Sequence, residues 1–309
     1  MSHPRKRFFR QRAHANPLVS IEHLEVPVRP FRGRTDDAGA FDVFRHYPSA
    51  DASRRVTMVD VGCGYGGLLI RLAPQFKDEL LLGMEIRDKV AEYVRLRIEA
   101  DRAAHRAGER PEPPSDDEGQ GVQESQSAKF GDLEHDYNNV SVAQSNSMKH
   151  WTRFFAKGQL KKLFFCFPDP HFKASKVRWR IISPALLSQY AFSLAIGGML
   201  YTITDVRDLH EWMVLHCTQH PLFERVPDAD LEADPAAQTM WNATEEGQKV
   251  ERTQGKKFMA VFRRVERSVP TFDLATEKVP IRPIFSYVSG KSEEHFKDKP
   301  SRIGATSAR

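Results

Sequence analysis

The sequence predicts an α/β domain built on a seven-stranded, mostly parallel sheet with helices on both faces. Short apolar runs alternate with helix-length amphipathic stretches from Val56 to about Arg264, the pattern of a helix-covered sheet. A glycine-rich turn directly follows the first apolar run, and an acidic residue ends the second. The 309 residues, 40% of them apolar, suffice for one large domain with tails and fit two full domains poorly.

The apolar runs give the order of the expected elements. We place strands near residues 56–61, 80–85, 140–144, 162–167 and 199–204, then a final pair near 223–226 and 258–263. Helices are expected to begin near Gly66, Arg87, Arg180 and Val206. One more is predicted after Thr244, whose hydroxyl is a suitable N-cap.

Charge is distributed unevenly along the chain, whose formal net charge is +5. Residues 1–34 hold eight Lys/Arg against two Glu, whereas residues 108–136 hold two Lys/Arg against nine Asp/Glu. We therefore expect a basic N-terminal arm over 1–50, a folded domain over 51–266 with a disordered acidic insertion at 108–136, and a weakly ordered tail over 267–309. The arm indicates either a polyanionic partner or a solvated tail.

Cysteine usage and hydropathy indicate the compartment. Cys63, Cys166 and Cys217 are isolated, so neither a zinc site nor a disulfide framework is expected, and a reducing compartment is favoured. No apolar run approaches 18 residues, and no apolar segment follows the N-terminal basic cluster. We expect a soluble protein that is not secreted and that binds no metal.

The turn Val59-Asp-Val-Gly-Cys-Gly-Tyr-Gly-Gly67 predicts a nucleotide-cofactor site. Glycines let the backbone approach a ligand closely, and the following helix offers unpaired N–H groups. The spacing Gly62-x-Gly64-x-x-Gly67 also satisfies the dinucleotide fingerprint. The turn alone leaves NAD, S-adenosylmethionine and a ligand-free turn open.

Two carboxylates favour S-adenosylmethionine over NAD. Glu85 ends the second apolar run 23 residues after Gly62, close to the spacing at which an acidic residue receives the ribose hydroxyls of either cofactor. Asp60 precedes the glycines, where S-adenosylmethionine has positive charges and NAD has a pyrophosphate. Asp60 therefore favours methyl transfer.

A proline-framed carboxylate follows the fourth predicted strand, in Phe167-Pro-Asp-Pro-His-Phe-Lys173. Open α/β sheets bind ligands outside the carboxyl ends of their strands, so Asp169 is expected to lie at the site. Aromatic neighbours could stack on a base, as in the target-base clamp of amino-methylating enzymes. A plain proline-rich turn is the alternative.

A basic cluster comes next, comprising Lys173, Lys176, Arg178 and Arg180, with Trp179 among them. Because the cluster adjoins Asp169, we expect it to contact RNA phosphates, together with Arg5, Lys6, Arg7, Arg10 and Arg12 of the arm. For Trp179 we favour packing in the core over stacking on a base.

With these motifs in order, the chain resembles the tRNA (guanine-N7-)-methyltransferase family, eukaryotic catalytic subunit. The matching strings include FRQRAHANP, VDVGCGYGGLL, GMEIR, SNSMKH, KGQLKKLFFCFPDPHFK, WRIIS, YTITDV and TEEGQKVER, and they span about Arg5 to Arg264. The long FPDPHFK string together with TEEG is specific to that family, whereas the glycine turn is not.

The resemblance implies a class I methyltransferase fold (Rossmann-like), S-adenosylmethionine as cofactor, and N7 methylation of the variable-loop guanosine at tRNA position 46. It places Asp169 as the active-site carboxylate. With Asp60 and Gly64 from the turn, the expected cofactor contacts are Gly62, Glu85, Arg87, Asn146, Ser147, Cys166, Thr244 and Glu246. Ser147, Cys166 and Gln248 depart from the family's usual Ala, Leu and Lys.

The resemblance also implies partners, namely tRNA and a WD-repeat propeller subunit in a heterodimer, and we expect a nuclear location, with the cytoplasm as an alternative. Two rival functions remain at this point. One is an NAD-dependent oxidoreductase, which lacks a catalytic His or Lys placed for hydride chemistry. The other is a non-catalytic basic RNA-binding subunit that keeps the fold.

Overall fold

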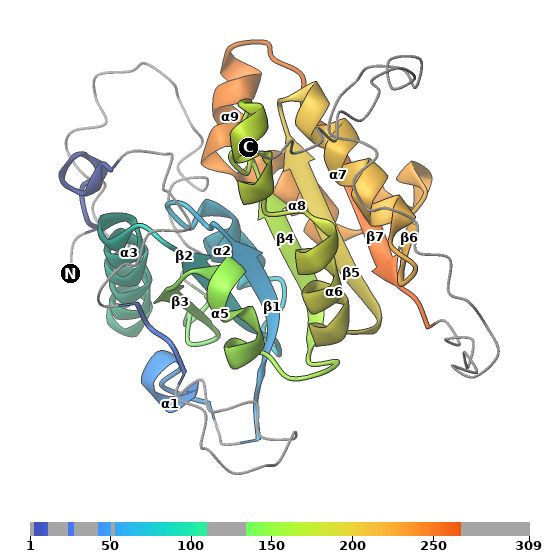
Figure 1. The fold of residues 1–309 in the computed structure, drawn as a ribbon. Helices are drawn as coiled ribbons and strands as arrows, with labels where there is room; N and C mark the ends of the chain where they lie inside the picture. The colour runs from blue at the N-terminus through green and yellow to red at the C-terminus, as the bar shows by residue number, and fades with distance from the viewer. Residues whose placement is uncertain (1–2, 12–23, 28–42, 51–52, 110–133, 267–309) are drawn as a thin grey trace, which may run out of the picture. The chain divides into compact units, whose positions relative to one another are not determined.

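The computed structural model describes residues 3–11, 24–27, 43–50, 53–109 and 134–266 (Figure 1). Its centre is a seven-stranded sheet in the order β3-β2-β1-β4-β5-β7-β6, in which β7 runs opposite to the six other strands. The strands are β1 Val56–Val61, β2 Leu80–Glu85, β3 Val140–Gln144, β4 Leu160–Cys166, β5 Leu194–Thr204, β6 Phe223–Arg225 and β7 Phe258–Arg264. The predicted fold class is confirmed.

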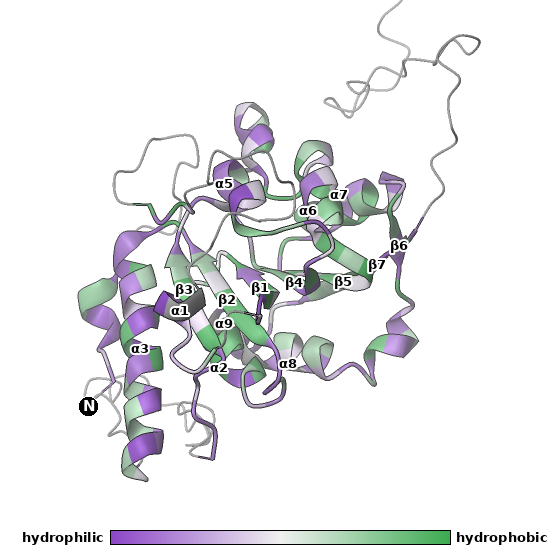
Figure 2. Cartoon of the chain, turned by 90° about the horizontal axis from the view of Figure 1, so that it is seen from below, coloured by the Kyte–Doolittle hydropathy of each residue, from purple (hydrophilic) through white to green (hydrophobic). Residues whose placement is uncertain are grey.

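Helices cover both faces of this sheet (Figure 2). One face carries α5 Ser147–Phe154, α6 Pro184–Ser193 and α7 Arg207–Gln219, and the other carries α2 Gly67–Leu72, α3 Asp88–Ala107 and α8 Pro235–Ala243. The remaining helices are η1 Lys6–Phe9, α1 Val43–His46, η3 Ala174–Trp179, η4 Asp228–Leu231 and α9 Glu245–Arg252. Among the described residues, none of these helices has the length and apolar character needed to span a membrane.

The predicted strands all form, with one large difference at the start of β5. The strand begins at Leu194, which pairs with Leu160, instead of near Met199. The register shifts between Leu160 and Lys162, and Gly197 adopts a left-handed φ of 83°. Gly197 and Gly198 therefore mark an irregularity inside β5 and not the beginning of the strand.

The helix expected near Arg180 is the main error in the predicted helices. Residues 174–179 form the 3-10 helix η3, and α6 begins only at Pro184, after the extended Ser183. Proline at the first helical position is favoured because its missing N–H would have no partner there. Helices α5 and α8 were not predicted, although the side chains of Asn146 and Asp234 cap them. The predicted N-cap Thr244 is confirmed by its bond from the Gly247 N–H, 3.1 Å.

Residues 3–11 of the N-terminal arm pack on α3. His3 Nε2 lies 2.8 Å from Asp101 Oδ1, both side chains being buried, and the Phe9 ring meets the Tyr93 ring edge-on at 5.7 Å. Arg5, Lys6, Arg7 and Arg10 are exposed on this segment. Arg12, most of the acidic insertion (110–133) and the tail (267–309) lie outside the described residues.

Gly83 in β2 is predicted to be sensitive to any side chain. A Cβ there would lie 2.5 Å from Leu69 Cδ1 and 2.7 Å from Cys63 Sγ, in the core between β2 and α2. Gly83→Ala should lower the free energy of unfolding by about 1–3 kcal/mol, because overpacking outweighs the roughly 0.4–1 kcal/mol that alanine gains through the unfolded chain. Urea unfolding measures this, and an unchanged or raised midpoint would contradict it.

Candidate functional site

A cavity of about 200 Å³ lies at the carboxyl ends of β1, β2, β3 and β4. This is where parallel α/β sheets bind ligands. Seven predicted site residues line it: Gly62, Glu85, Arg87, Asn146, Ser147, Cys166 and Asp169. The structure thus brings the glycine turn, the end of β2 and the proline-framed carboxylate to one cavity.

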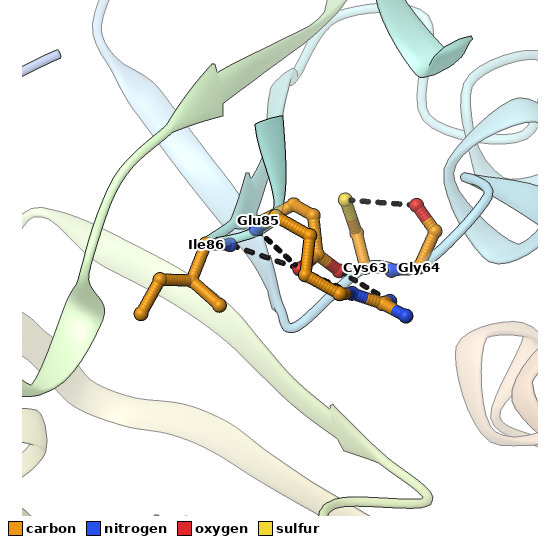
Figure 3. Close-up of polar contacts among 5 residues, drawn as sticks. Cys63, Gly64, Glu85 and Ile86 are labelled. Atoms are coloured by element: carbon orange, nitrogen blue, oxygen red, sulfur yellow. Dashed lines mark hydrogen bonds and ion pairs between the residues drawn. The ribbon is translucent and has the colours of Figure 1, made fainter. Parts of the chain in front are cut away.

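Glu85 connects the end of β2 to the glycine-rich turn (Figure 3). Its side chain is almost fully buried, and its Oε2 accepts from the Gly64 N–H at 3.1 Å. Its Oε1 accepts from the Ile86 and Arg87 N–H groups at 2.9 and 3.0 Å. The carboxylate is therefore fixed by backbone donors before any ligand arrives.

Arg87 contacts the same carboxylate with its side chain. Its Nε and Nη2 donate to Glu85 Oε1 and Oε2 at 3.0 and 2.9 Å, a bidentate ion pair. Burial lowers the pKa of Arg87, but the bond and charge of Glu85 outweigh that effect, so the pKa is raised. The Glu85 carboxylate therefore accepts from five N–H donors, although its two oxygens offer about four lone-pair sites. A ribose hydroxyl can bind Glu85 only if the Arg87 side chain turns aside.

The glycine turn leaves space for a nucleoside cofactor. Gly62 and Gly64 have φ values of +73° and +54°. Apart from each glycine and its two neighbours in the chain, no heavy atom of the described residues lies within 4 Å of a Cβ built on either. In the same lining, Ser145 is buried, and its Oγ makes no hydrogen bond within the described part of the chain. Burial, and then the charge of Asp60, raises the pKa of Cys166, so this wall carries a neutral thiol. An open backbone cradle, a neutral wall and, once Arg87 turns aside, a carboxylate acceptor for the ribose fit S-adenosylmethionine.

Asp169 lines the same cavity from a strained turn. Phe167 and His171 adopt left-handed φ values of +48° and +45°, which cost non-glycine residues roughly 1–3 kcal/mol each. Asp169 Oδ1 accepts from the His171 N–H at 3.1 Å, and Oδ2 lies 3.6 Å from His171 Nδ1. The side chain remains 24% exposed, so a substrate group can reach it.

The other predicted cofactor contacts do not line the cavity. Asp60 is buried at the end of β1, and Gly64 acts through its bond to Glu85. Thr244 caps α9, and Glu246 is exposed, with Oε2 3.4 Å from Lys249 Nζ. Their predicted contacts with the cofactor stay predictions.

The structure places Trp179 in the cavity lining, whereas the sequence analysis favoured the core. Trp179 is half-buried in the cavity wall, with its ring edge-on to His171 at 5.6 Å, so its predicted place in the core was wrong. The 3-10 helix η3 explains the error, because it turns Trp179 back toward the Asp169 turn. Lys173, Lys176 and Arg178 are exposed, as the predicted RNA contacts require, whereas Arg180 is only partly exposed.

The strand order and this cavity define a class I S-adenosylmethionine-dependent methyltransferase. Dinucleotide-binding sheets have the order 3-2-1-4-5-6, whereas here the antiparallel β7 lies between β5 and β6. A sequence profile for a family described as "Putative methyltransferase" matches residues 54–260. The chain belongs to the tRNA (guanine-N7-)-methyltransferase family.

Three relatives carry this assignment, each named tRNA (guanine-N(7)-)-methyltransferase. The Caenorhabditis elegans protein is 45% identical over 262 residues, covering 85% of this chain and 89% of its own. The human protein is 44% identical over 277 residues, 86% of this chain and 90% of its own. The Candida glabrata protein is 47% identical over 265 residues, 85% of this chain and 82% of its own. S-adenosylmethionine, and not NAD, is therefore the cofactor.

Proposed function

We propose that this protein transfers the methyl group of S-adenosylmethionine to N7 of a guanosine in tRNA, at position 46 in the variable loop. The observation that carries the proposal is that Asp169 lines the same cavity as Glu85 and Gly62 of the glycine turn. The family assignment supports tRNA and guanine N7, and the resemblance supports position 46.

Guanine N7 needs alignment more than it needs a base. Its lone pair lies in the ring plane and carries no proton, so attack on a sulfonium methyl requires no proton removal. Bound S-adenosylmethionine supplies that electrophilic methyl. The protein's part is to orient the ring, exclude water and balance the positive charge that develops on it.

Asp169 is suited to orienting guanine. Its carboxylate could accept from N1–H and from the exocyclic amine of guanine, a donor pair that adenine lacks, and its charge would offset the cationic product. Because the edge carrying these donors is paired within folded tRNA, the base must leave its pairing to reach Asp169. Trp179 and His171 beside Asp169 offer aromatic surfaces for the displaced base.

The experiment that tests the position compares three transcripts of one tRNA. With guanosine at position 46, label from the methyl-labelled cofactor should enter the RNA. With adenosine there, incorporation should fall to background, while a guanosine-to-adenosine change elsewhere in an unpaired loop leaves it unchanged. Equal labelling of the first two transcripts would contradict position 46.

The exposed cations next to Asp169 should contribute to the salt dependence of tRNA binding. Changing Lys173, Lys176 and Arg178 together to glutamine should flatten the plot of log affinity against log salt by up to about 2–3 units, since each phosphate contact releases counterions. A matched triple change of Arg55, Lys77 and Lys157, which are exposed and precede strands at the opposite edge, should leave the slope unchanged. If the triple change of Lys173, Lys176 and Arg178 leaves the salt slope at its wild-type value, these cations do not contact tRNA phosphates.

We also propose a WD-repeat propeller partner and a nuclear location, both supported by the family resemblance. Coexpression with a propeller of this kind should give a heterodimer that methylates tRNA faster than the chain alone, as size-exclusion chromatography and rate measurements would show. Migration of the two chains as separate species would contradict the partnership. Imaging of the tagged chain tests the location.

A further inference from the structure

The turn that carries Asp169 needs support from outside itself. Left-handed residues flank it on both sides, Phe167 and His171, and neither is a glycine. Such strain persists only where surrounding contacts hold the backbone. Pro168 and Pro170 have no N–H groups, so the turn has few donors of its own for this purpose.

Two contacts hold the turn at its ends. The Phe167 N–H donates to the Ile203 carbonyl at 2.8 Å, which ties the start of the turn to β5. Arg180 Nε donates to the Pro170 carbonyl at 2.9 Å, which ties the other side to the residue after η3. Because Pro170 lies next to Asp169 in the chain, this bond acts directly on the orientation of the carboxylate.

Helix α7 in turn holds Arg180. The guanidinium lies over the Trp212 ring, 4.7 Å from its centroid, and Trp212 Nε1 donates to the Ile182 carbonyl at 2.8 Å. The His216 ring packs edge-on against Trp212 at 4.1 Å. Burial, and then the charge of Arg180, lowers the pKa of His216, so this neighbour stays neutral and does not repel the guanidinium.

We propose that Arg180 is a positioning residue, which transmits the fixed geometry of α7 to the Asp169 turn and does not bind tRNA phosphate. This replaces its predicted role in RNA binding and rests on the proposed function of Asp169. Its neighbours Lys173, Lys176 and Arg178 are exposed, whereas Arg180 uses its Nε and the face of its guanidinium within the protein.

Arg180→Lys tests the proposal, because lysine keeps the charge but cannot reproduce a planar group that stacks and donates at once. The kcat for tRNA methylation should fall about 10- to 100-fold, the size of effect that a small misplacement of a reacting group produces. The KM for tRNA, its salt dependence and the Kd for S-adenosylhomocysteine should stay within about twofold. Arg207→Lys is the matched control, since Arg207, at the start of α7, also lies over an aromatic ring, that of Phe258 in β7.

Trp212→Leu should reproduce the kcat loss, and the double variant should lose little more, since both side chains act through one contact. Deuterium exchange of the segment 167–173 gives a readout independent of tRNA, and it should speed up in Arg180→Lys and not in Arg207→Lys. Unchanged kcat and exchange, or a raised KM with a flattened salt slope, would overturn the proposal. If the wild-type protein methylates no tRNA but exchange still responds, the proposed function fails and the positioning role stands.

Discussion

Asp169→Ala is expected to lower the rate of tRNA methylation by about 10²–10³, the usual cost of losing one preorganised electrostatic group. The carboxylate lines the cavity and contacts His171 within its own turn, at 3.1 Å through Oδ1 and 3.6 Å through Oδ2. Binding of S-adenosylhomocysteine, measured by calorimetry, should therefore stay within about twofold. The result would separate methyl transfer from cofactor binding.

Two further variants make the Asp169 experiment specific. Asp169→Asn keeps the shape and one acceptor but loses the charge, so its rate should fall between those of wild type and Asp169→Ala. Asp230→Ala removes an exposed carboxylate far along the chain in η4 and should leave the rate unchanged. A rate for Asp169→Ala within a few-fold of wild type would remove Asp169 from the mechanism.

Glu85→Ala should act on the cofactor instead. The substitution removes the acceptor expected for the ribose hydroxyls, and it also leaves the Gly64, Ile86 and Arg87 N–H groups without their bonds. Hydrogen bonds to a charged group contribute roughly 1.5–3 kcal/mol, so the Kd for S-adenosylhomocysteine should rise about 10- to 100-fold.

The control for Glu85 is Glu99→Ala, which likewise removes a carboxylate paired with an arginine, on the exposed side of α3. That variant should bind the cofactor as wild type does, because exposed ion pairs contribute little. Circular dichroism of both variants establishes that the fold is intact. A folded Glu85→Ala protein with the wild-type Kd would reject the role of Glu85.

The sheet and half of the site could be predicted because they depend on local patterns. Apolar runs located every strand of the described sheet, and the spacing from Gly62 to Glu85 predicted that these two residues share one site. The start of β5 could not be predicted, since Leu194 joins the sheet only through its pairing with Leu160 around an irregular Gly-Gly segment.

The roles of Trp179 and Arg180 depend on contacts distant in sequence. Nothing near Trp179 in sequence indicates that it lies against His171. Arg180 follows Lys176 by four residues and Arg178 by two, so the sequence predicts that it binds phosphate with them. Only the position of Trp212, 32 residues later, shows that the Arg180 guanidinium is used inside the protein. The sequence pattern predicted Asp169 as a site residue, and the tertiary structure shows that Arg180 and Trp212 support its turn.

The most direct test of the central claim is the identity of the methylated atom. Wild-type protein, purified with and without the coexpressed propeller, is incubated with methyl-labelled S-adenosylmethionine and unmodified tRNA, and the RNA is then digested to nucleosides and analysed by mass spectrometry. The account predicts label in 7-methylguanosine, with one modified residue per tRNA, and none from Asp169→Ala under conditions where wild type reaches completion in a short time. Label in any other nucleoside, or no transfer by either preparation, would contradict it.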